Sequence, residues 1–259
     1  MASQDSVFGI HNSEFRIGVI TSGRSLFLLL IRLDMSNPLV IAIDGPAGAG
    51  KSTVAQKLAA RLGLNYVDSG ATYRAAALKV LEAGVSPEDE TAVVEIIART
   101  EIRFTTDGTC SSVWLEGRDV TQAIRTSDVT LAAAKVSRLL EVRKKLIALQ
   151  RSLVQGRGVV MEGRDIGTVV FPEAPLKIFL KAEVEERARR RLEQDKQEGR
   201  AATLEQTAYE IGRRDQLDAE RKISPLVAAP NACEIDSTHL TADQVIERIL
   251  ALVRERKLL

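Results

Sequence analysis

The sequence predicts an α/β fold, in which helices flank a parallel sheet and a small antiparallel β insert interrupts the pattern. From Leu39 onward, short apolar runs alternate with helical patterns, which is typical of parallel strands joined by crossover helices. The segment Glu101–Thr121 has β-rich sequence on both sides of an Asp-Gly pair, which is a hairpin signal. With 259 residues, 45% of them hydrophobic, the chain is long enough for one large domain.

The first half of the predicted core begins with the apolar run "LVIAI", which has the character of a buried strand. Later elements are recognised by their apolar spacing. In order, we expect a strand at 39–43, a helix at 51–62, a short strand at 64–68 and helices at 72–83 and 87–100.

The second half opens with a long helical pattern and the buried run "GVVM". A Thr-Ala-Asp-Gln start marks the beginning of its last helix. In order, we expect a helix at 127–155, strands at 158–161 and 176–180, charged helices at 183–199 and 204–222, a strand at 232–236 and a helix at 241–258.

Residues 1–34 precede this pattern. The apolar run Ser25–Ile31 is too short to span a bilayer, and no small-residue cleavage site follows it. Met35 begins "MSNPLVIAIDG", a natural start for a cytosolic domain. We therefore expect residues 1–34 to be a dispensable extension, disordered or the result of a start site placed too early; a targeting peptide is the alternative.

Charge and residue counts exclude several classes of function. The net charge is only +1, so neither nucleic acid nor a membrane surface is an expected partner. Cys110 and Cys233 lie far apart without metal-ligand spacing, which favours a reduced, cytoplasmic protein. The two histidines, His11 and His239, lie away from every motif, which argues against Ser/His/Asp and Cys/His hydrolysis.

A phosphate-binding loop follows the first core strand. The segment "GPAGAGKST" matches G-x-x-x-x-G-K-[ST] and lies between a predicted strand and a predicted helix, as that motif requires. Its glycines allow backbone N–H groups to surround phosphates, Lys51 can reach the outer phosphates and Ser52 can bind Mg²⁺. The predicted ATP contacts are Gly45, Pro46, Ala47, Gly48, Ala49, Gly50, Lys51, Ser52 and Thr53.

The loop alone does not say how the nucleotide is used. A GTPase should carry an Asn-Lys-x-Asp motif, yet none of the four asparagines is followed by lysine. An ABC-type or motor ATPase should carry a signature loop, and the chain has none. A kinase for a small phosphorylated acceptor needs a second site that is rich in arginine.

Arginines and acids do occur at the ends of predicted elements. Glu162, Arg164 and Asp165 follow the strand "GVVM", at the sheet edge where parallel sheets bind ligands. In "DSGATYR", Ser69 and Arg74 could form a small anion site at a helix start, although an N-cap and a surface arginine would look the same. Further candidates are Arg125, Arg143 and the set Arg214, Asp218 and Arg221, whose spacing places them along one helical face.

Taken together, four segments resemble the bacterial cytidylate kinase family. They are "IDGPAGAGKST", "DSGATYR", "EGRDIGTVVFP" and the Arg-Asp-x-x-Asp-x-x-Arg run that leads to "SPL", and the resemblance extends from Leu39 to the C-terminus. It implies transfer of the γ-phosphate of ATP to CMP and dCMP, with Mg²⁺, by a monomer that binds only small molecules. The alternatives are a related kinase that prefers UMP or another monophosphate, and an ATP-binding regulatory module.

The resemblance also assigns residues. Ser69, Arg74 and Arg164 would lie nearest the acceptor phosphate, Arg143 and Asp165 would also address the cytosine, and Glu162 or Asp165 would orient Mg²⁺ through water. The implied CMP contacts are Ser69, Tyr73, Arg74, Arg143, Arg164, Asp165, Arg214, Asp218 and Arg221, with Arg214 and Asp218 at the sugar hydroxyls. The implied catalytic residues are Lys51, Arg164, Arg187 and Arg191.

The same resemblance implies a division of the chain. The insert would belong to the monophosphate-binding region, and 183–199 would be a short helical lid that carries Arg187 and Arg191. The expected parts are an extension at 1–34, core at 35–91, the insert at 92–127, core at 128–182, the lid and following helix at 183–225, and core at 226–259.

One position departs from the family pattern. Ala134 stands where a serine is expected to contact the base, and the loss of a hydroxyl weakens discrimination that depends on hydrogen bonds. Ser137 lies one turn further on and is the candidate replacement.

Overall fold

In the computed structural model, the described residues are 19–22, 25–28, 38–106, 111–156, 158–197, 202–221 and 223–259. They form two units, Met1–Pro38 and Leu39–Leu259. In the first unit, β1 (Val19–Ser22) pairs antiparallel with β2 (Ser25–Leu28), which the sequence did not predict. Most of the expected extension at 1–34 lies outside the described residues.

A five-stranded parallel sheet forms the centre of the second unit, as expected from the alternating pattern. The strand order is β10-β9-β3-β8-β4, with β3 between β8 and β9. Because β3 is buried on both faces, its sequence is an uninterrupted apolar run before the final aspartate. The strands are β3 (Leu39–Asp44), β4 (Asn65–Asp68), β8 (Gly158–Gly163), β9 (Leu176–Lys181) and β10 (Cys233–Asp236).

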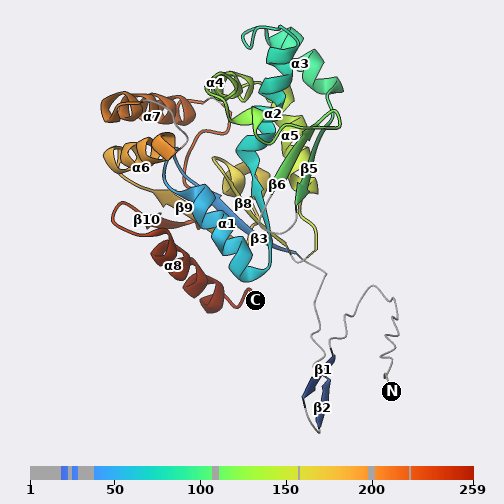
Figure 1. The fold of residues 1–259 in the computed structure, drawn as a ribbon, viewed down its shortest axis with the longest axis vertical. Helices are drawn as coiled ribbons and strands as arrows, with labels where there is room; N and C mark the ends of the chain where they lie inside the picture. Colours follow the sequence, from blue (N-terminus) through green and yellow to red (C-terminus); the bar gives the residue numbers. More distant parts are fainter. Residues whose placement is uncertain are drawn as a thin grey trace, which may run out of the picture. The chain divides into compact units, whose positions relative to one another are not determined.

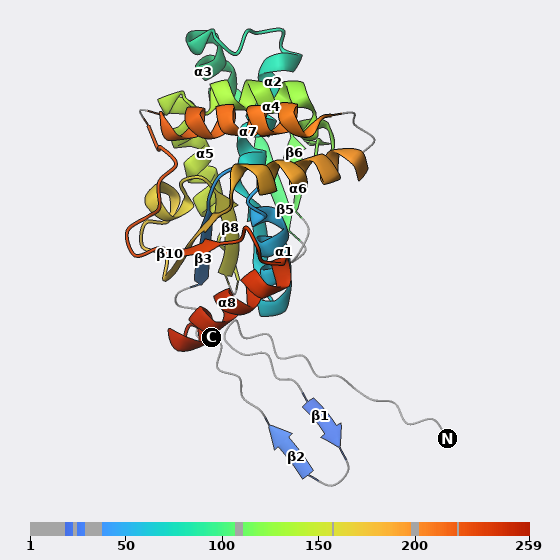
Figure 2. The same cartoon turned by 90° about the vertical axis from the view of Figure 1, so that its left-hand side faces the viewer.

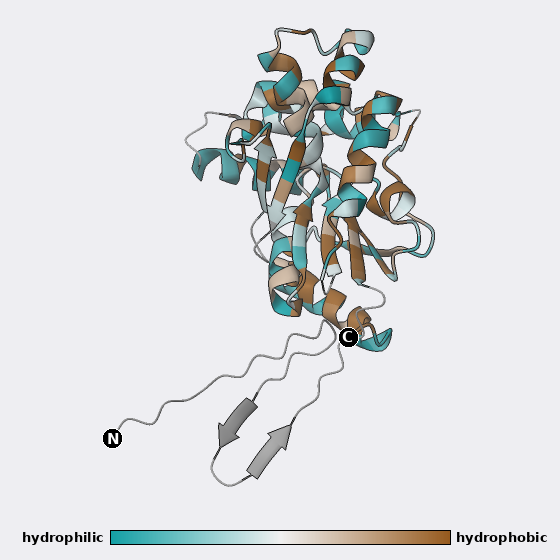
Figure 3. Ribbon diagram, turned by 90° about the vertical axis from the view of Figure 1, so that its right-hand side faces the viewer, coloured by the Kyte–Doolittle hydropathy of each residue, from teal (hydrophilic) through white to brown (hydrophobic). Residues whose placement is uncertain are grey.

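The two faces of the sheet have different coverings. One face packs with α1 (Lys51–Leu62) and α8 (Ala242–Glu255) in a single apolar cluster. The other face packs against a short π-helix, η2 (Ile166–Val170), and part of the chain around α5 (Leu140–Ser152). Figure 3 shows hydrophobic residues along the core strands, whereas the helices alternate between hydrophobic and hydrophilic positions. Among the described residues, no helix is both long and apolar enough to cross a bilayer.

The insert forms a three-stranded antiparallel sheet in the order β5-β6-β7. The predicted hairpin is confirmed by β5 and β6, although its turn at 107–110 lies outside the described residues, and β7 adds a strand that was not predicted. The insert shares one apolar core with the helices around it. These elements are α2 (Ser69–Glu82), α3 (Glu90–Arg99), β5 (Ile102–Thr106), β6 (Ser111–Leu115), β7 (Arg118–Asp119), η1 (Ala123–Arg125) and α4 (Ser127–Val136).

The single helix predicted at 127–155 is wrong. It consists of α4 and α5, separated at Ser137–Leu139, where Leu139 has an extended backbone with ψ of 121°. The buried Arg143 donates a hydrogen bond from Nη1 to the Ser137 carbonyl at 3.0 Å and so satisfies a carbonyl at the break. Apolar periodicity continues through both helices, which is why the sequence pattern did not reveal the break.

Two further helices follow strand β9 in the sequence. α6 (Val184–Gln197) and α7 (Leu204–Ala219) lie side by side in both views (Figures 1 and 2). The connection expected around 198–203 lies largely outside the described residues. The helix predicted to reach residue 222 ends at Ala219, so Arg221 lies beyond the helix and not on its face.

Candidate active site

The carboxyl ends of three neighbouring strands bring acidic residues to one edge of the sheet. In the parallel register, Asp44 of β3 pairs with Gly163 of β8, and Asp68 of β4 pairs with Glu162 of β8. The phosphate loop leaves β3 at this same edge. The strand ends therefore bring the phosphate loop close to the segments that follow β4 and β8, although these segments lie far apart in the sequence.

The phosphate loop approaches its neighbours too closely for side chains at two glycines. A Cβ atom on Gly45 (φ 149°) would lie 2.0 Å from the Leu180 carbonyl oxygen, and one on Gly48 (φ 77°) would lie 3.0 Å from Arg187 Cβ. Gly50 is also left-handed and precedes α1 directly. The glycines of the motif are therefore required by backbone conformation and close packing as well as by phosphate binding.

Lys51 is buried beneath this loop and faces other cations. It is only 5% exposed, and its Nζ donates a hydrogen bond of 2.6 Å to the Pro46 carbonyl. Burial, followed by repulsion from Arg164, lowers the pKa of Lys51 to about 7, against the opposing attraction of Glu162. The ammonium group is thus removed from water and lies close to a second cation, Arg164.

Glu162 connects the phosphate loop with β4. Its Oε1 accepts a 2.8 Å hydrogen bond from the buried Tyr66 hydroxyl, and its carboxylate is also hydrogen-bonded to Ser52. Burial and the nearby Asp68 raise the pKa of Glu162. The Ser52 side chain is exposed at the helix start, and hydroxyl and carboxylate oxygens are ligands that Mg²⁺ prefers, so these groups fit a magnesium site. Sequence reasoning missed Tyr66, which has the appearance of an ordinary strand residue.

The start of α2 supplies one wall of the site. Asp68 caps the helix by accepting from Ala71 N at 3.3 Å, and it pairs with Arg74 at 2.5 Å. The helix begins at Ser69, three residues earlier than predicted. Ser69 is buried, and a Cβ atom on Gly163 would lie 2.4 Å from its hydroxyl oxygen, so β8 and α2 are in close contact here.

A second wall contains a buried ion pair between Arg143 and Asp165. Arg143 is 2% exposed, and its guanidinium lies 5.4 Å from the centroid of the Tyr73 ring. Within the described ranges, Arg143 Nε has no hydrogen-bond partner and remains an available donor. Ser137, the candidate replacement for a hydroxyl at Ala134, donates its own hydroxyl to the Ala134 carbonyl at 3.0 Å.

Asp218 pairs with two of the predicted arginines. This 2% exposed carboxylate accepts from Arg164 Nε at 3.0 Å and also pairs with Arg221, which lies just beyond α7. Burial opposes ionisation of Asp218, but Arg164 and Arg221 hold its pKa below the ordinary value. Burial, and then repulsion from Arg164, lowers the pKa of Arg214 to about 10.

The two predicted lid arginines have different surroundings. Arg187 is buried, donates from Nη1 to the Ala47 carbonyl at 3.0 Å and pairs with Asp215 of α7. Arg191 is 45% exposed and pairs with Asp195 at 3.2 Å on its own helix. The structure therefore brings Arg187, but not Arg191, into contact with the phosphate loop.

Arg190 was not predicted and lies beside the loop. It donates to the Ser237 hydroxyl at 3.1 Å, and that hydroxyl donates to the Ala49 carbonyl at 3.2 Å. Three arginines follow one another at 189–191, and no sequence pattern separates the one that reaches the loop.

Asp44 is a second residue that the sequence reasoning missed. Its carboxylate accepts hydrogen bonds from the backbone N–H groups of Ile166 and Gly167, both at 2.8 Å. Burial raises its pKa to about 6. A charged residue at the end of an otherwise apolar strand was the available signal.

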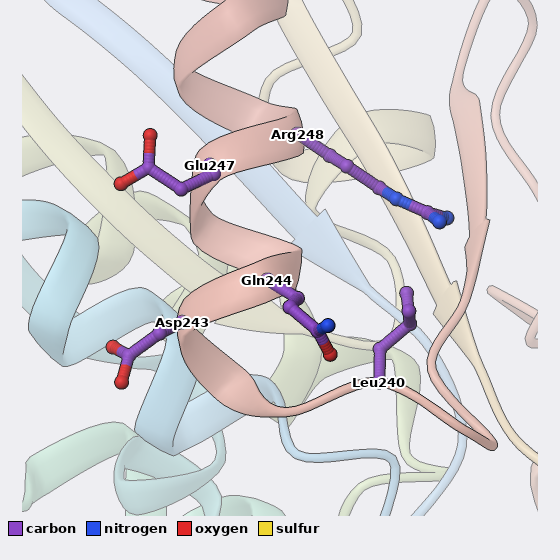
Figure 4. Close-up of a pocket in the computed structure, with 5 residues that line it drawn as sticks. All are labelled: Leu240, Asp243, Gln244, Glu247 and Arg248. Carbon is purple, nitrogen blue, oxygen red and sulfur yellow. The ribbon is translucent and has the colours of Figure 1, made fainter.

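Two cavities lie outside this cluster or at its border. One, of about 420 Å³, is lined by α8 and contains none of the predicted site residues; Figure 4 shows Asp243 and Glu247 pointing to one side of the helix and Gln244 and Arg248 to the other. The other, of about 340 Å³, includes Arg143 in its lining. The site is therefore best defined by its charged groups and hydrogen bonds.

Comparisons with known proteins give a consistent result. Residues 41–255 match the model of the family described as cytidylate kinase. A relative from Geobacillus kaustophilus named cytidylate kinase is 49% identical over 86% of this chain and 99% of its own length. Proteins of the same name from Caldanaerobacter subterraneus and Azotobacter vinelandii are 49% and 47% identical, over 83% and 85% of this chain and 94% and 97% of theirs.

Proposed function

The chain belongs to the cytidylate kinase family and phosphorylates CMP and dCMP, and we propose that ATP is the phosphoryl donor and Mg²⁺ the assisting metal. The donor would bind at the loop Gly45–Thr53, and the acceptor would bind among the arginines that face it. A monomer in the cytoplasm is the expected form of the enzyme.

The observation that carries this proposal is the crowding of buried cations beside the phosphate loop, where Lys51 and Arg214 both lie near Arg164. Lys51 and Arg214 both have lowered pKa values, about 7 and about 10, because each is buried and each faces Arg164. Phosphate groups of a donor and an acceptor would relieve the repulsion among these cations. Lys51 belongs to the donor loop, whereas Arg164 follows β8, so the two nucleotides would meet between them.

On the acceptor side, we assign the phosphate to Ser69, Arg74, Arg164 and Arg221. The Arg143–Asp165 pair would read the cytosine, because it offers an available donor at Arg143 Nε and carboxylate oxygens as acceptors. Tyr73, which packs on Arg143, would support that orientation. Arg214 and Asp218 would contact the sugar hydroxyls, and this allows both ribose and deoxyribose.

For the metal, the geometry supports Glu162 over Asp165. Glu162 is hydrogen-bonded to Ser52, the expected metal ligand, whereas Asp165 is paired with Arg143. Ser52 would bind directly and Glu162 through water. When bound there, Mg²⁺ would neutralise charge on the donor phosphates.

Phosphoryl transfer requires in-line alignment of donor and acceptor and compensation of charge on the phosphate oxygens. The protein residues therefore need to position the two nucleotides and neutralise their phosphates, and they need not form covalent bonds. Lys51 would hold the donor phosphates and Arg164 the acceptor phosphate. Arg187 and Arg191 are assigned to the transferring group. Arg187 is already hydrogen-bonded to the loop, and Arg191 would approach if the lid 183–199 closed and excluded water.

A coupled assay of ADP release with CMP, dCMP, UMP and AMP as acceptors tests the proposal. We expect CMP and dCMP to stimulate ADP release more strongly than UMP or AMP. A clear preference for UMP or AMP would assign the chain to the alternative specificity. If no acceptor stimulated ADP release, an ATP-binding regulatory module would be the better description.

A further inference from the structure

Asp44 occupies the last position of β3, between the phosphate loop and the end of β8. It pairs with Gly163 of β8 on one side and with Phe179 of β9 on the other, and the next residue opens the phosphate loop. Only 3% of the residue is exposed. Its two carboxylate oxygens each accept one backbone N–H, Oδ1 from Ile166 and Oδ2 from Gly167.

These two N–H groups belong to the first turn of η2, where a helix has no internal acceptors. In most helices the preceding residue supplies a side-chain cap, and aspartate is among the preferred residues. Asp165 stands at that position, yet its side chain makes no capping hydrogen bond and pairs instead with Arg143. Asp44 provides the cap from another strand, 122 residues away in sequence from Ile166.

We propose that Asp44 is a positioning residue for acceptor recognition: by capping η2 it leaves Asp165 available to pair with Arg143. The inference rests on the proposed function, which assigns the Arg143–Asp165 pair to the cytosine. Without the cap from Asp44, the exposed N–H groups of η2 would compete with Arg143 for the Asp165 carboxylate. Base selection would weaken, although no group that touches the base had been removed.

The ionisation of Asp44 agrees with this role. Burial raises its pKa to about 6, the N–H groups of Gly167 and Ile166 act in the opposite direction, Asp165 adds to the increase and Lys51 reduces it. Near neutral pH, both oxygens are therefore acceptors. Below about pH 6, one carboxylate oxygen would carry a proton and become a hydrogen-bond donor. It would then face a backbone N–H group that needs an acceptor.

The first test is the variant Asp44→Asn, which keeps the shape but replaces one acceptor oxygen with a donor NH₂. We expect the ratio of kcat/KM for CMP to that for UMP to fall on the order of tenfold or more, with a much smaller change in the KM for ATP. Asp236→Asn is the matched control, because Asp236 ends β10 and accepts from Thr238 N at 2.9 Å. The control should keep the wild-type ratio.

A double-mutant cycle with Asp165→Asn separates positioning from general structure. If Asp44 acts through Asp165, the double variant should select CMP no less well than Asp165→Asn alone. Independent, additive losses would overturn the inference. Equal CMP and UMP rates in the wild type, or full selectivity in Asp165→Asn, would instead contradict the proposed function; full selectivity in Asp44→Asn alone would contradict only the role of Asp44.

A measurement on the wild type covers the case in which Asp44→Asn does not fold. The backbone amide resonances of Ile166 and Gly167 should titrate with a common midpoint near the pKa of Asp44, about 6. The CMP-to-UMP ratio should fall over the same range as the pH decreases. A CMP-to-UMP ratio that stays constant across the midpoint of these amide resonances would overturn the inference.

Discussion

Arg164 Nε donates a 3.0 Å hydrogen bond to Asp218 Oδ2 across 54 residues of sequence. The same carboxylate pairs with Arg221 through its other oxygen. Two arginines of the proposed acceptor site are therefore held by one buried acid. Such preorganisation lowers the cost of ordering side chains when an acceptor phosphate arrives.

Replacing Arg164 with alanine should damage the acceptor site selectively. The variant loses the charged contact that we propose for the CMP phosphate, so kcat/KM for CMP should fall on the order of 100-fold. The affinity for ATP, measured by titration calorimetry, should change little. Arg118→Ala is the control, because Arg118 pairs with Glu82 on the surface and should leave both values unchanged. Normal turnover of CMP by Arg164→Ala would reject the acceptor assignment.

Removing the acid that holds the arginines should destabilise the fold. Asp218→Ala leaves Arg164 and Arg221 without their shared buried partner, and we expect the free energy of unfolding to fall by about 3 kcal/mol at neutral pH. The folded-state pKa of Asp218 is lowered, so its contribution is present above the ordinary value of 3.8 and is lost as the pH falls below it.

Urea denaturation as a function of pH measures this contribution. The exposed Asp243, which pairs with Lys57 at 3.3 Å, is the control, and Asp243→Ala should cost less than about 1 kcal/mol. A loss at Asp218 no larger than that at Asp243, or one that grows as the pH decreases, would be inconsistent with the prediction.

ATP binding should be coupled to proton uptake by Lys51. Its pKa is about 7 in the free protein, and phosphates would raise it, so at about pH 8 the amine must gain a proton when ATP binds. Calorimetry in buffers of different ionisation enthalpy should detect an uptake approaching one proton. Lys51→Arg stays charged and should abolish the uptake. Equal uptake in both proteins would assign the proton to another group.

Glu162 and Asp165 should respond differently to the metal. Glu162→Gln replaces the carboxylate next to Ser52 with a neutral amide, so the Mg²⁺ concentration for half-maximal activity should rise on the order of tenfold. Asp165→Asn should leave that concentration unchanged and reduce the preference for CMP over UMP. The reverse pattern in magnesium titrations would exchange the two assignments.

The wild-type protein should lose stability relative to the Asp44→Asn variant as the pH rises from acid to neutral. Its pKa is raised from 3.8 to about 6, so the folded state binds the proton more tightly and its favourable contribution is lost as the pH rises through about 6. The difference in unfolding free energy between wild type and variant should fall by up to about 3 kcal/mol over this range. A difference from urea denaturation that is constant with pH would disagree.

Much of the fold was predictable, because short segments of the sequence indicate its elements. The uninterrupted apolar run of β3, the Gly-Lys-Ser motif of the phosphate loop and the capped start of α8 can each be recognised within a few residues of sequence. The alternation of strands and helices then implied a parallel sheet, and with it the edge at which Glu162 and Arg164 would lie.

What the sequence alone determined was the α/β class, the position of the phosphate loop and most of the charged candidates, since motifs and periodicity are properties of contiguous residues. The break between α4 and α5, the Tyr66–Glu162 hydrogen bond and the cap from Asp44 to η2 were decided only by the tertiary structure. Each depends on a buried polar group finding its partner on another element, because an unpaired one would be costly, and local sequence does not record which distant partner will be there.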